Sequence, residues 1–388
     1  MRDLLRFGRA DRSFLARWFW TVDRPLLLLL LALMGFGLIA VAAASPAAAD
    51  RLSDAGTRVP ALHFLERQLV WVALGLAVML GVSMLEKGAA RRFALAGCLA
   101  AVFALAAVPF LGVETNGAVR WLQLAGFQVQ PVEFAKPLFA VTTAWLLAAR
   151  FDDRSLPVIP LSAAMLAILV LLLALQPDFG QAALLVAVWL AQAALAGLPL
   201  ALLVGAVALG LVGLALAYAT NPHVARRIDG FLHGEGDTYQ VDRALDGFRS
   251  GGLFGTGPGD GTAKFRLPEA QTDYIFAVIG EEFGAIACFA LALLYLVIMI
   301  RVVLQLVEED DPFTLLAGTG LVVQFTGQAF INMSVNLALA PAKGMTLPFV
   351  SYGGSSYLAC ALGMGLLLAL TRRNRHVLTS PYLRARPT

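Results

Sequence analysis

The stretch LPEAQTDYIFAVIGEEFG, residues 267–284, joins a polar loop to a strongly apolar segment. From Asp273 onwards, the chain has the composition of a membrane-spanning helix. Three carboxylates nevertheless lie in this segment: Asp273 at its start, and Glu281 and Glu282 two turns deeper. Ionisable residues in membrane spans are rare and normally face the bundle interior or a water-filled cavity. The stretch therefore predicts a membrane helix with a polar site at one end.

The rest of the chain shares this apolar character. Of its 388 residues, 59% are hydrophobic and 14% are charged, whereas soluble domains carry about 25% charged residues. Continuous apolar runs, typical of membrane helices, lie at about 25–44, 67–85, 92–112, 132–149, 157–176, 181–197, 199–220, 273–300, 313–338 and 349–371. The predicted fold is an all-α polytopic membrane protein with about ten transmembrane helices.

The distribution of positive charge predicts the orientation of these helices. With the N-terminus in the cytoplasm, most of the 29 Lys and Arg fall on the cytoplasmic side, and half of the others lie in one long loop. Short cytoplasmic loops normally carry this excess of positive charge. We therefore expect a cytoplasmic basic arm (1–24), a membrane domain (25–371) and a cytoplasmic tail (372–388). The basic composition then reflects topology and does not indicate nucleic-acid binding.

The long loop, about 221–272, is expected on the outer side. Residues 238–250 have the pattern of an amphipathic surface helix. The segment GFRSGGLFGTGPGDG, residues 247–261, is rich in glycine but has no Walker motif. It is either a flexible re-entrant turn or a loop that brings backbone N–H groups to a phosphate. The cysteines and histidines lack the spacing of metal ligands, so no metal site is predicted from them.

Polar residues interrupt the apolar pattern in four clusters, and the predicted topology puts all four at the outer ends of the helices. The clusters are residues 116–137, 176–182, 267–284 with their glycine-rich approach, and 332–356. Because four separate segments fall on one side, we expect a single site that faces the outer leaflet.

Within these clusters, the spacing of charged residues separates candidate roles. Glu133 and Lys136 are three residues apart and can pair on one helix face, either to fix packing or to line a cavity. Asp178 is expected to cap a helix. At about 100° per residue, Glu282 lies on the opposite side of its helix from Asp273, so the carboxylates of this helix cannot all share one cavity. Glu281 and Glu282 are therefore predicted to be structural, paired with hydroxyls on neighbouring helices or with arginines at helix ends.

The clusters resemble the SEDS family (shape, elongation, division and sporulation) of polytopic peptidoglycan polymerases, over about residues 20–372. The segments AKGMTLPFVSYGGSS (342–356) and VDRPLLLLLLALMGFGLIAVAAAS (22–45) are more similar to the division members than to the elongation members. One departure is QPVEF, where Val132 replaces the usual serine. Val132 argues against an essential hydroxyl at that position, while Glu133 and Lys136 match the family.

The resemblance implies septal peptidoglycan glycosyltransferase activity: polymerisation of lipid II on the outer face of the bacterial inner membrane, with release of undecaprenyl pyrophosphate. It implies a catalytic carboxylate at Asp273. This reaction would need a base for the acceptor hydroxyl and positive charge for the leaving pyrophosphate. A divalent cation such as Mg²⁺ could supplement that positive charge. The expected substrate-binding residues are Arg120, Glu133, Lys136, Lys264, Arg266, Lys343 and Ser351.

Two alternatives stay open at this point. A lipid II flippase would place functional polar residues through the depth of the bundle, and a scaffold for division proteins would need no reactive group. For a polymerase, cross-linking requires a partner, because no Ser-x-x-Lys nucleophile lies in an outer domain. We expect a class B penicillin-binding protein of the FtsI type, alongside other divisome membrane proteins. Its helix is expected on the small residues Gly280, Gly284, Ala285, Ala287, Gly318, Gly320 and Gly327.

Overall fold

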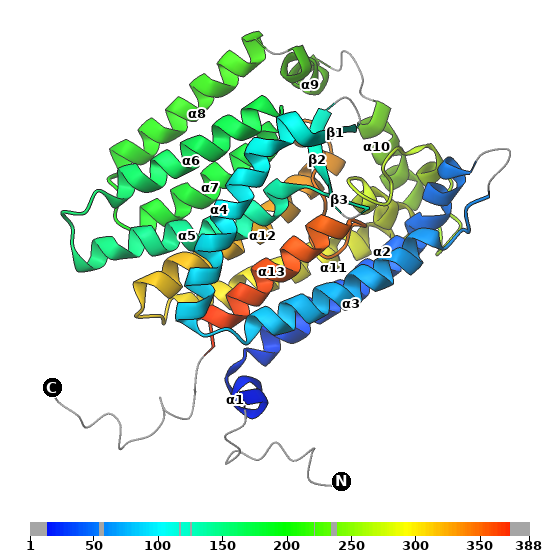
Figure 1. The fold of residues 1–388 in the computed structure, drawn as a ribbon. Coiled ribbons are helices and arrows are strands. Elements are labelled where there is room, and N and C mark those ends of the chain that lie inside the picture. The colour runs from blue at the N-terminus through cyan, green and yellow to red at the C-terminus, as the bar shows by residue number, and fades with distance from the viewer. Residues whose placement is uncertain are drawn as a thin grey trace, which may run out of the picture.

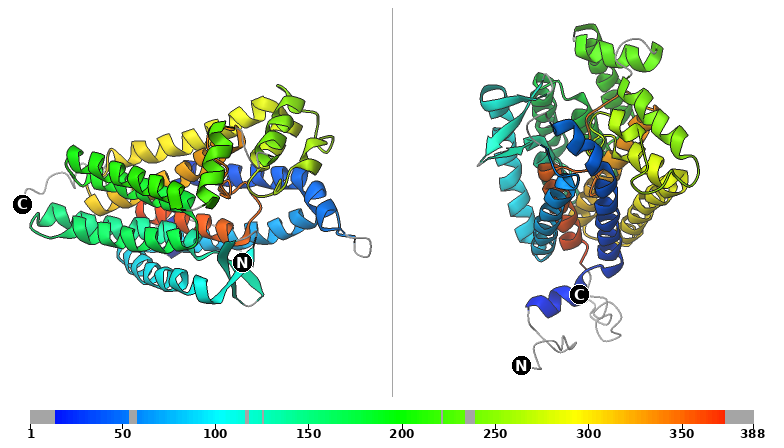
Figure 2. Two further views of the ribbon diagram at one scale, coloured as in Figure 1. Left: turned by 90° about the horizontal axis from the view of Figure 1, so that it is seen from above. Right: turned by 90° about the vertical axis from the view of Figure 1, so that its right-hand side faces the viewer.

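The computed structural model describes residues 14–53, 58–115, 118–124, 126–220, 222–233 and 239–372. Its long helices pack side by side in one bundle, as Figures 1 and 2 show. The elements are α1 (Phe14–Thr21), α2 (Arg24–Leu52), α3 (His63–Ser83), α4 (Lys87–Leu111), β1 (Gly112–Thr115), β2 (Ala118–Leu124), β3 (Phe127–Val129), α5 (Pro131–Asp152), α6 (Val158–Leu175), α7 (Phe179–Leu195), α8 (Leu200–Thr220), α9 (Pro222–His233), α10 (Tyr239–Gly251), η1 (Ala263–Arg266), α11 (Ile275–Leu306), α12 (Pro312–Asn336) and α13 (Gly354–Leu370).

Ten of these helices coincide with the ten predicted spans. Eight are long and apolar enough to cross a membrane, and the other two, α7 and α13, are apolar helices of 17 residues each. Helices α5, α12 and α13 are largely buried in the bundle, whereas α8 is exposed along most of its length. The predicted all-α polytopic membrane fold is therefore confirmed. The basic arm and the tail lie mostly outside the described residues.

Helix starts are marked by capping side chains. Asp23 accepts a hydrogen bond from the Leu26 N–H (3.2 Å), and Asp311 accepts one from the Phe313 N–H (3.2 Å). A proline follows each cap in the first turn, where its fixed φ suits a helix and its missing N–H costs nothing. Asp23 also forms a two-pronged ion pair with Arg301 (3.0 and 3.1 Å), which ties the start of α2 to α11.

A three-stranded antiparallel sheet, in the order β1-β2-β3, lies between α4 and α5. Val113 pairs with Trp121, and Leu122 pairs with Val129. This sheet was not expected from the sequence, because its strands are short and lie within a cluster that stands out only by its polarity. We call the end of the bundle with this sheet, α9 and α10 the loop end, and the opposite end, with α1 and the end of α13, the tail end (Figure 1). Element η1 packs against α10 and so lies at the loop end.

Helix α11 coincides with the span predicted at about 273–300 but is broken, which the apolar run alone did not reveal. Gly284 has φ 80° and ψ 177°, which interrupts the helix after its first nine residues. A Cβ at position 284 would collide with the carbonyl oxygen of Leu253 and the backbone nitrogen of Gly255. Glycine is thus required there by both its positive φ and the close approach of another backbone.

The glycine loop, residues 251–261, supplies hydrogen bonds to the backbone groups freed by this break. The N–H groups of Thr256 and Gly257 donate to the carbonyls of Glu281 (2.9 Å) and Glu282 (3.1 Å). In return, the N–H of Ala285 donates to the Gly252 carbonyl (2.9 Å). Unpaired backbone groups at membrane depth cost several kcal/mol each, so the loop and the broken helix depend on each other.

Both deep carboxylates of α11 bond to the chain between α10 and α11, in the glycine loop and in η1. Glu281 accepts hydrogen bonds from the N–H groups of Ala263 (2.6 Å) and Lys264 (2.9 Å). Glu282 forms an ion pair with the Lys264 ammonium and accepts from the Gly259 N–H (3.0 Å). Their partners are therefore loop backbone and a lysine, not the expected hydroxyls or arginines. Of the N–H groups in the glycine-rich segment that was considered for a phosphate, that of Gly259 donates to a carboxylate, and those of Thr256 and Gly257 donate to backbone carbonyls of α11.

Four of the five glycines expected to form a partner face on the eighth and ninth spans, Gly280, Gly284, Gly318 and Gly320, are buried inside the molecule. A Cβ added at position 280 would collide with the Phe248 ring, and one at position 284 would collide with the backbone of the glycine loop. A Cβ added at position 318, 320 or 327 would approach the side chain of Leu306, Gln192 or Leu184, respectively. The expected docking surface is therefore wrong for the four buried glycines, because this chain's own atoms occupy the space. For the half-buried Gly327 and Ala287 and the exposed Ala285, it stays a prediction.

Lys264→Met should destabilise the folded protein by about 3–5 kcal/mol, because it leaves the Glu282 carboxylate buried and unpaired. The double change Lys264→Met/Glu282→Gln should recover much of this loss. Thermal unfolding of purified protein in one detergent measures both. Lys87→Met is the matched control, since it removes an exposed ion pair with Asp311 and should cost about 1 kcal/mol or less. Equal losses for Lys264→Met and Lys87→Met would contradict the role given to the buried pair.

Candidate functional site

Asp273 lies at the loop end, half-buried, in the turn directly before α11. Its backbone carbonyl accepts hydrogen bonds from the side-chain amides of Asn332 (2.8 Å) and Asn336 (2.9 Å) in the last turns of α12. The oxygen of the Asn336 amide accepts from the N–H of Ala277 in the first turn of α11 (3.1 Å). These bonds, which we call the amide clamp, fix the backbone of Asp273 relative to α11 and α12. They do not involve its carboxylate.

The residues before Asp273 are held by the segment that leads into α13. The Ser351 hydroxyl donates to the Thr272 carbonyl (2.5 Å) and accepts from the Leu347 N–H (2.8 Å). The Tyr352 N–H donates to the Gln271 carbonyl (2.8 Å). Ser351 is 3% exposed, so its hydroxyl positions this turn. The expectation that Ser351 contacts substrate conflicts with this burial.

The same turn contains a residue in an uncommon backbone conformation. Glu269 has φ 54°, a region that residues other than glycine rarely adopt. Its carboxylate accepts a hydrogen bond from the Thr272 hydroxyl (2.7 Å). Such conformations persist only where the surroundings impose them, and they cluster at functional sites. The turn that presents Asp273 is therefore held in a single shape.

Lys343 reaches the same place from a distant part of the sequence. A Cβ on the adjacent Gly344 would lie 3.1 Å from the Asp273 Oδ2 atom. The stem of Lys343 passes Gly180 at the start of α7, with Cδ 2.9 Å from the corresponding Cβ position. Both Lys343 and Asp273 are half-buried. The site thus places a cationic side chain and a carboxylate on adjoining segments.

The ion pair expected from the spacing of Glu133 and Lys136 is present on α5. The Lys136 Nζ lies 2.9 Å from a Glu133 carboxylate oxygen, and the two residues are 0% and 3% exposed. Each charge has a second partner: the Gln181 amide donates to Glu133 (2.7 Å), and Lys136 donates to the Gln328 amide oxygen (2.6 Å). The pair therefore links α5 to α7 and α12.

One face of α12 connects this ion pair to Asp273. Gln328, Asn332 and Asn336 are four residues apart and so share that face. Gln328 donates to the Thr346 carbonyl (3.0 Å), and Asn332 donates to the Met345 carbonyl (2.6 Å). Sequence reasoning missed these amides as a set, although side-chain amides at this spacing in an apolar helix are a visible signal.

Arg120 and Asp178 hold the turn between α6 and α7. The Arg120 guanidinium, on β2, donates to the carbonyls of Gln176 (3.0 Å) and Pro177 (2.7 Å). Asp178 lies at the N-cap of α7 and accepts from the Gln181 N–H (3.5 Å) and the Gln130 amide (3.4 Å). The structure therefore joins Arg120, expected at the substrate, to the backbone beside the Glu133 network.

Two of the expected substrate-binding cations lie apart from this network. Lys264 is 1% exposed, pairs with Glu282 and donates to the Ala43 carbonyl (3.1 Å). Its burial removes it from substrate contact, contrary to the expectation from sequence. Arg266 is exposed and lines a separate pocket beside α10. Among the described residues, no three of His, Cys, Asp and Glu gather as metal ligands, so no residue is assigned to a divalent cation.

The double change Asn332→Ala/Asn336→Ala should loosen the Asp273 turn, because it removes both donors to the Asp273 carbonyl. Deuterium exchange of peptides covering 267–278 should rise several-fold, while peptides from the tail end of α2 stay unchanged. Thr326→Ala is the matched control, since that hydroxyl bonds only within α12, to Val322. Unchanged exchange at 267–278 in the double variant would show that the amides do not hold the turn.

The sequence and the fold agree with known proteins over nearly the whole chain. A family model described as "Cell cycle protein" (FtsW, RodA and SpoVE) matches residues 24–376. The probable peptidoglycan glycosyltransferase FtsW of Caulobacter vibrioides is 39% identical, over 95% of this chain and 93% of its own length. The protein of the same name from Thioalkalivibrio sulfidiphilus is 38% identical, over 90% of each chain.

Solved structures show the same fold. A chain from a peptidoglycan synthase complex, whose structure concerns the coordination of polymerization and crosslinking, superposes with a TM-score of 0.73 at 27% identity, covering 92% of this chain and 99% of that one. The rod shape determining protein RodA of Thermus thermophilus superposes with a TM-score of 0.65 at 27% identity, covering 90% and 96%. With the family model spanning the ten helices and the polar network, the chain belongs to the FtsW, RodA and SpoVE family of cell cycle proteins, the SEDS family.

Proposed function

We propose that this chain is a septal peptidoglycan glycosyltransferase that polymerises lipid II on the outer face of the inner membrane. The observation that carries the proposal is the clamped turn at the loop end, which presents the Asp273 carboxylate next to the Lys343 segment. The relatives named as probable peptidoglycan glycosyltransferases support the same reaction class.

The chemistry needs one base and one charge-stabilising group. The acceptor hydroxyl oxygen forms a bond to the anomeric carbon of the donor, the bond from that carbon to the pyrophosphate breaks, and the configuration inverts. The proton of the acceptor hydroxyl passes to Asp273, which must therefore lie at a fixed place. The amide clamp from Asn332 and Asn336 supplies this fixed position.

The departing pyrophosphate carries the electron pair of the broken bond and needs nearby positive charge. Lys343 is the candidate for this role, because its segment adjoins Asp273. The buried Glu133–Lys136 pair supports that segment through Gln328 and Thr346. In this proposal, Lys136 acts as a positioning residue, and Lys343 contacts substrate.

The sidedness of the site follows from charge. The excess of Lys and Arg near the tail end supports a cytoplasmic position for that end and an outward-facing loop end. The hydrogen-bonded polar network from Glu133 to Asp273 also lies towards the loop end. The position of this Asp273-linked network near the loop end supports a polymerase over the alternative flippase, which needs functional polar groups along a path through the bundle.

The partner proposed for cross-linking is a class B penicillin-binding protein, and the septum is the proposed location. The similar chain from a peptidoglycan synthase complex supports such an assembly. Because four of the five glycines of α11 and α12 are buried inside the bundle, the partner helix would contact the exposed apolar side chains of the bundle. We also propose that other divisome membrane proteins bind this chain.

Asp273→Asn should abolish most polymerisation while leaving the fold intact, because it keeps the side-chain volume and removes the base. A base contributes about 10²–10⁴-fold in rate. Purified protein with its transpeptidase partner and labelled lipid II, assayed for glycan chains, measures this. Asp260→Asn, the same change in an exposed part of the glycine loop, should keep full activity. Glycan synthesis by Asp273→Asn at the wild-type rate would refute the assignment.

Glu133→Gln and Lys136→Met should each destabilise the protein, by about 3–5 kcal/mol where a buried charge loses its partner. Together they should restore folding, and if the pair only positions the Lys343 segment, some polymerisation should return as well. Melting temperature and glycan synthesis are compared for the single and double variants. A stable double variant without any activity would instead give Lys136 a direct role with the pyrophosphate, and stable, fully active single variants would exclude both roles.

A further inference from the structure

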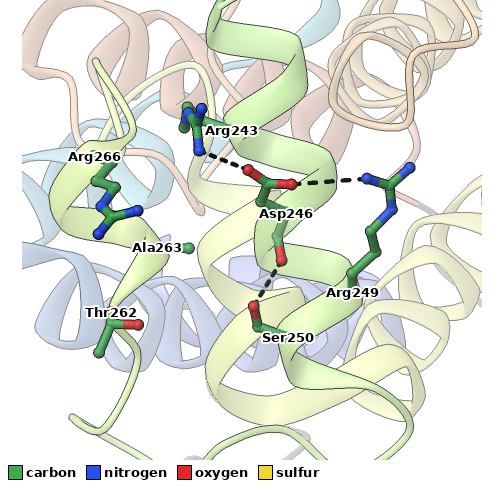
Figure 3. Close-up of a pocket in the computed structure, with 7 residues that line it drawn as sticks. All are labelled: Arg243, Asp246, Arg249, Ser250, Thr262, Ala263 and Arg266. Carbon is green, nitrogen blue, oxygen red and sulfur yellow. Dashed lines mark hydrogen bonds and ion pairs between the residues drawn. The ribbon is translucent and has the colours of Figure 1, made fainter.

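A pocket beside α10, apart from the Asp273 network, has no role in the reaction proposed above. It is a cavity of about 290 Å³ at the loop end (Figure 3). Three arginines from two segments line it: Arg243 and Arg249 from α10, and Arg266 from η1. The acidic group in its lining is Asp246. The pocket is therefore a concentration of positive charge on the surface.

The charges of the pocket are not balanced by its lining. Asp246 pairs with Arg243 (2.8 Å) and, more loosely, with Arg249 (3.7 Å). The Nε atom of Arg243 is buried and has no hydrogen-bond partner in the described part of the chain. Arg266 extends from the opposite wall in Figure 3, and no described residue forms an ion pair with it. One carboxylate against three guanidinium groups leaves room for an added anion.

The position of the pocket relative to the membrane follows from the residues after α10. Leu253 and Phe254 are 64% and 80% exposed. The Leu253 carbonyl accepts a hydrogen bond from the Ile286 N–H (3.3 Å), just past the break in α11. Ile286 and Phe289 are themselves exposed on this apolar membrane helix. The tip of the glycine loop thus lies against the apolar surface, about one turn of chain from Arg249.

We propose that this pocket binds the phosphate of an anionic phospholipid, with Leu253 and Phe254 against its acyl chains. Guanidinium groups hydrogen-bond phosphate oxygens in pairs and suit this ligand better than point charges do. Basic residues at the headgroup level attract anionic lipids. The guanidinium of Arg243, on α10, and that of Arg266, on the opposite wall, can contact one phosphate from two sides. Arg266 is then a lipid-binding residue and not part of the polymerisation site.

The test uses the full-length protein in a neutral detergent. Binding of short-chain phosphatidylglycerol, of phosphatidylcholine with the same acyl chains, and of glycerol phosphate is measured by native mass spectrometry. We expect phosphatidylglycerol to bind most tightly. Arg243→Gln and Arg266→Gln should each weaken its binding about fivefold, equivalent to about 1 kcal/mol per charge. Arg58→Gln removes an exposed loop-end arginine outside the pocket and is the matched control.

A second variant separates the lipid from a soluble anion. Leu253→Ser/Phe254→Ser should weaken phosphatidylglycerol binding and leave glycerol phosphate unaffected. Glycerol phosphate binding as tightly as phosphatidylglycerol would overturn the lipid assignment in favour of a soluble oxyanion. Equal affinity for the two phospholipids, or unchanged binding after Arg243→Gln/Arg266→Gln, would overturn the assignment of the arginine pocket as a binding site for anionic lipid. Glycan synthesis is not a readout here, so the outcome is independent of the polymerase proposal.

Discussion

A helix broken inside a membrane leaves backbone groups without partners, and the closure of one such break organises the loop end of this protein. Gly284 breaks α11, and the glycine loop bonds to the freed groups on both sides of it. The buried pair between Lys264 and Glu282 anchors that loop, and Glu281 orders its backbone. Irregular backbone is tolerated at membrane depth only when protein surrounds it. The long loop is therefore part of the bundle.

The short helix before the break carries the candidate catalytic turn, which is held on several sides. The glycine loop holds its far end at Glu281 and Glu282. The α12 amides and Ser351 hold its near end at Asp273. A carboxylate that acts as a base benefits from this arrangement, because its position is set by backbone bonds that do not use the carboxylate itself. Rigidity at the site thus originates in polar contacts buried around it.

The sequence predicted a polar contact correctly where both partners lie on one helix, and wrongly where the partner lies on another element. The Glu133–Lys136 pair follows from local geometry, because a three-residue spacing puts both side chains on one helix face. Lys264 and Ser351 were expected at the substrate because both lie in polar clusters at one side of the membrane. Their partners lie on other elements: Glu282 on α11 for Lys264, and Thr272 in the turn before α11 for Ser351. Polarity pointed to the segments of the candidate site but could not assign a partner to each polar group.

The amino-acid sequence by itself determined the membrane class, the positions of ten helices and the family, because these depend on composition, on apolar run length and on local motifs. Only the tertiary structure decided the break at Gly284, the sheet, the amide face of α12 that reaches Asp273, and the arginine pocket. The break and the amide face join segments that are separate in the chain, whereas the sheet (residues 112–129) and the pocket (residues 243–266) join neighbouring segments through turns that gave no clear pattern. Such contacts depend on how helices pack, and no local pattern of residues specifies which polar groups will then meet.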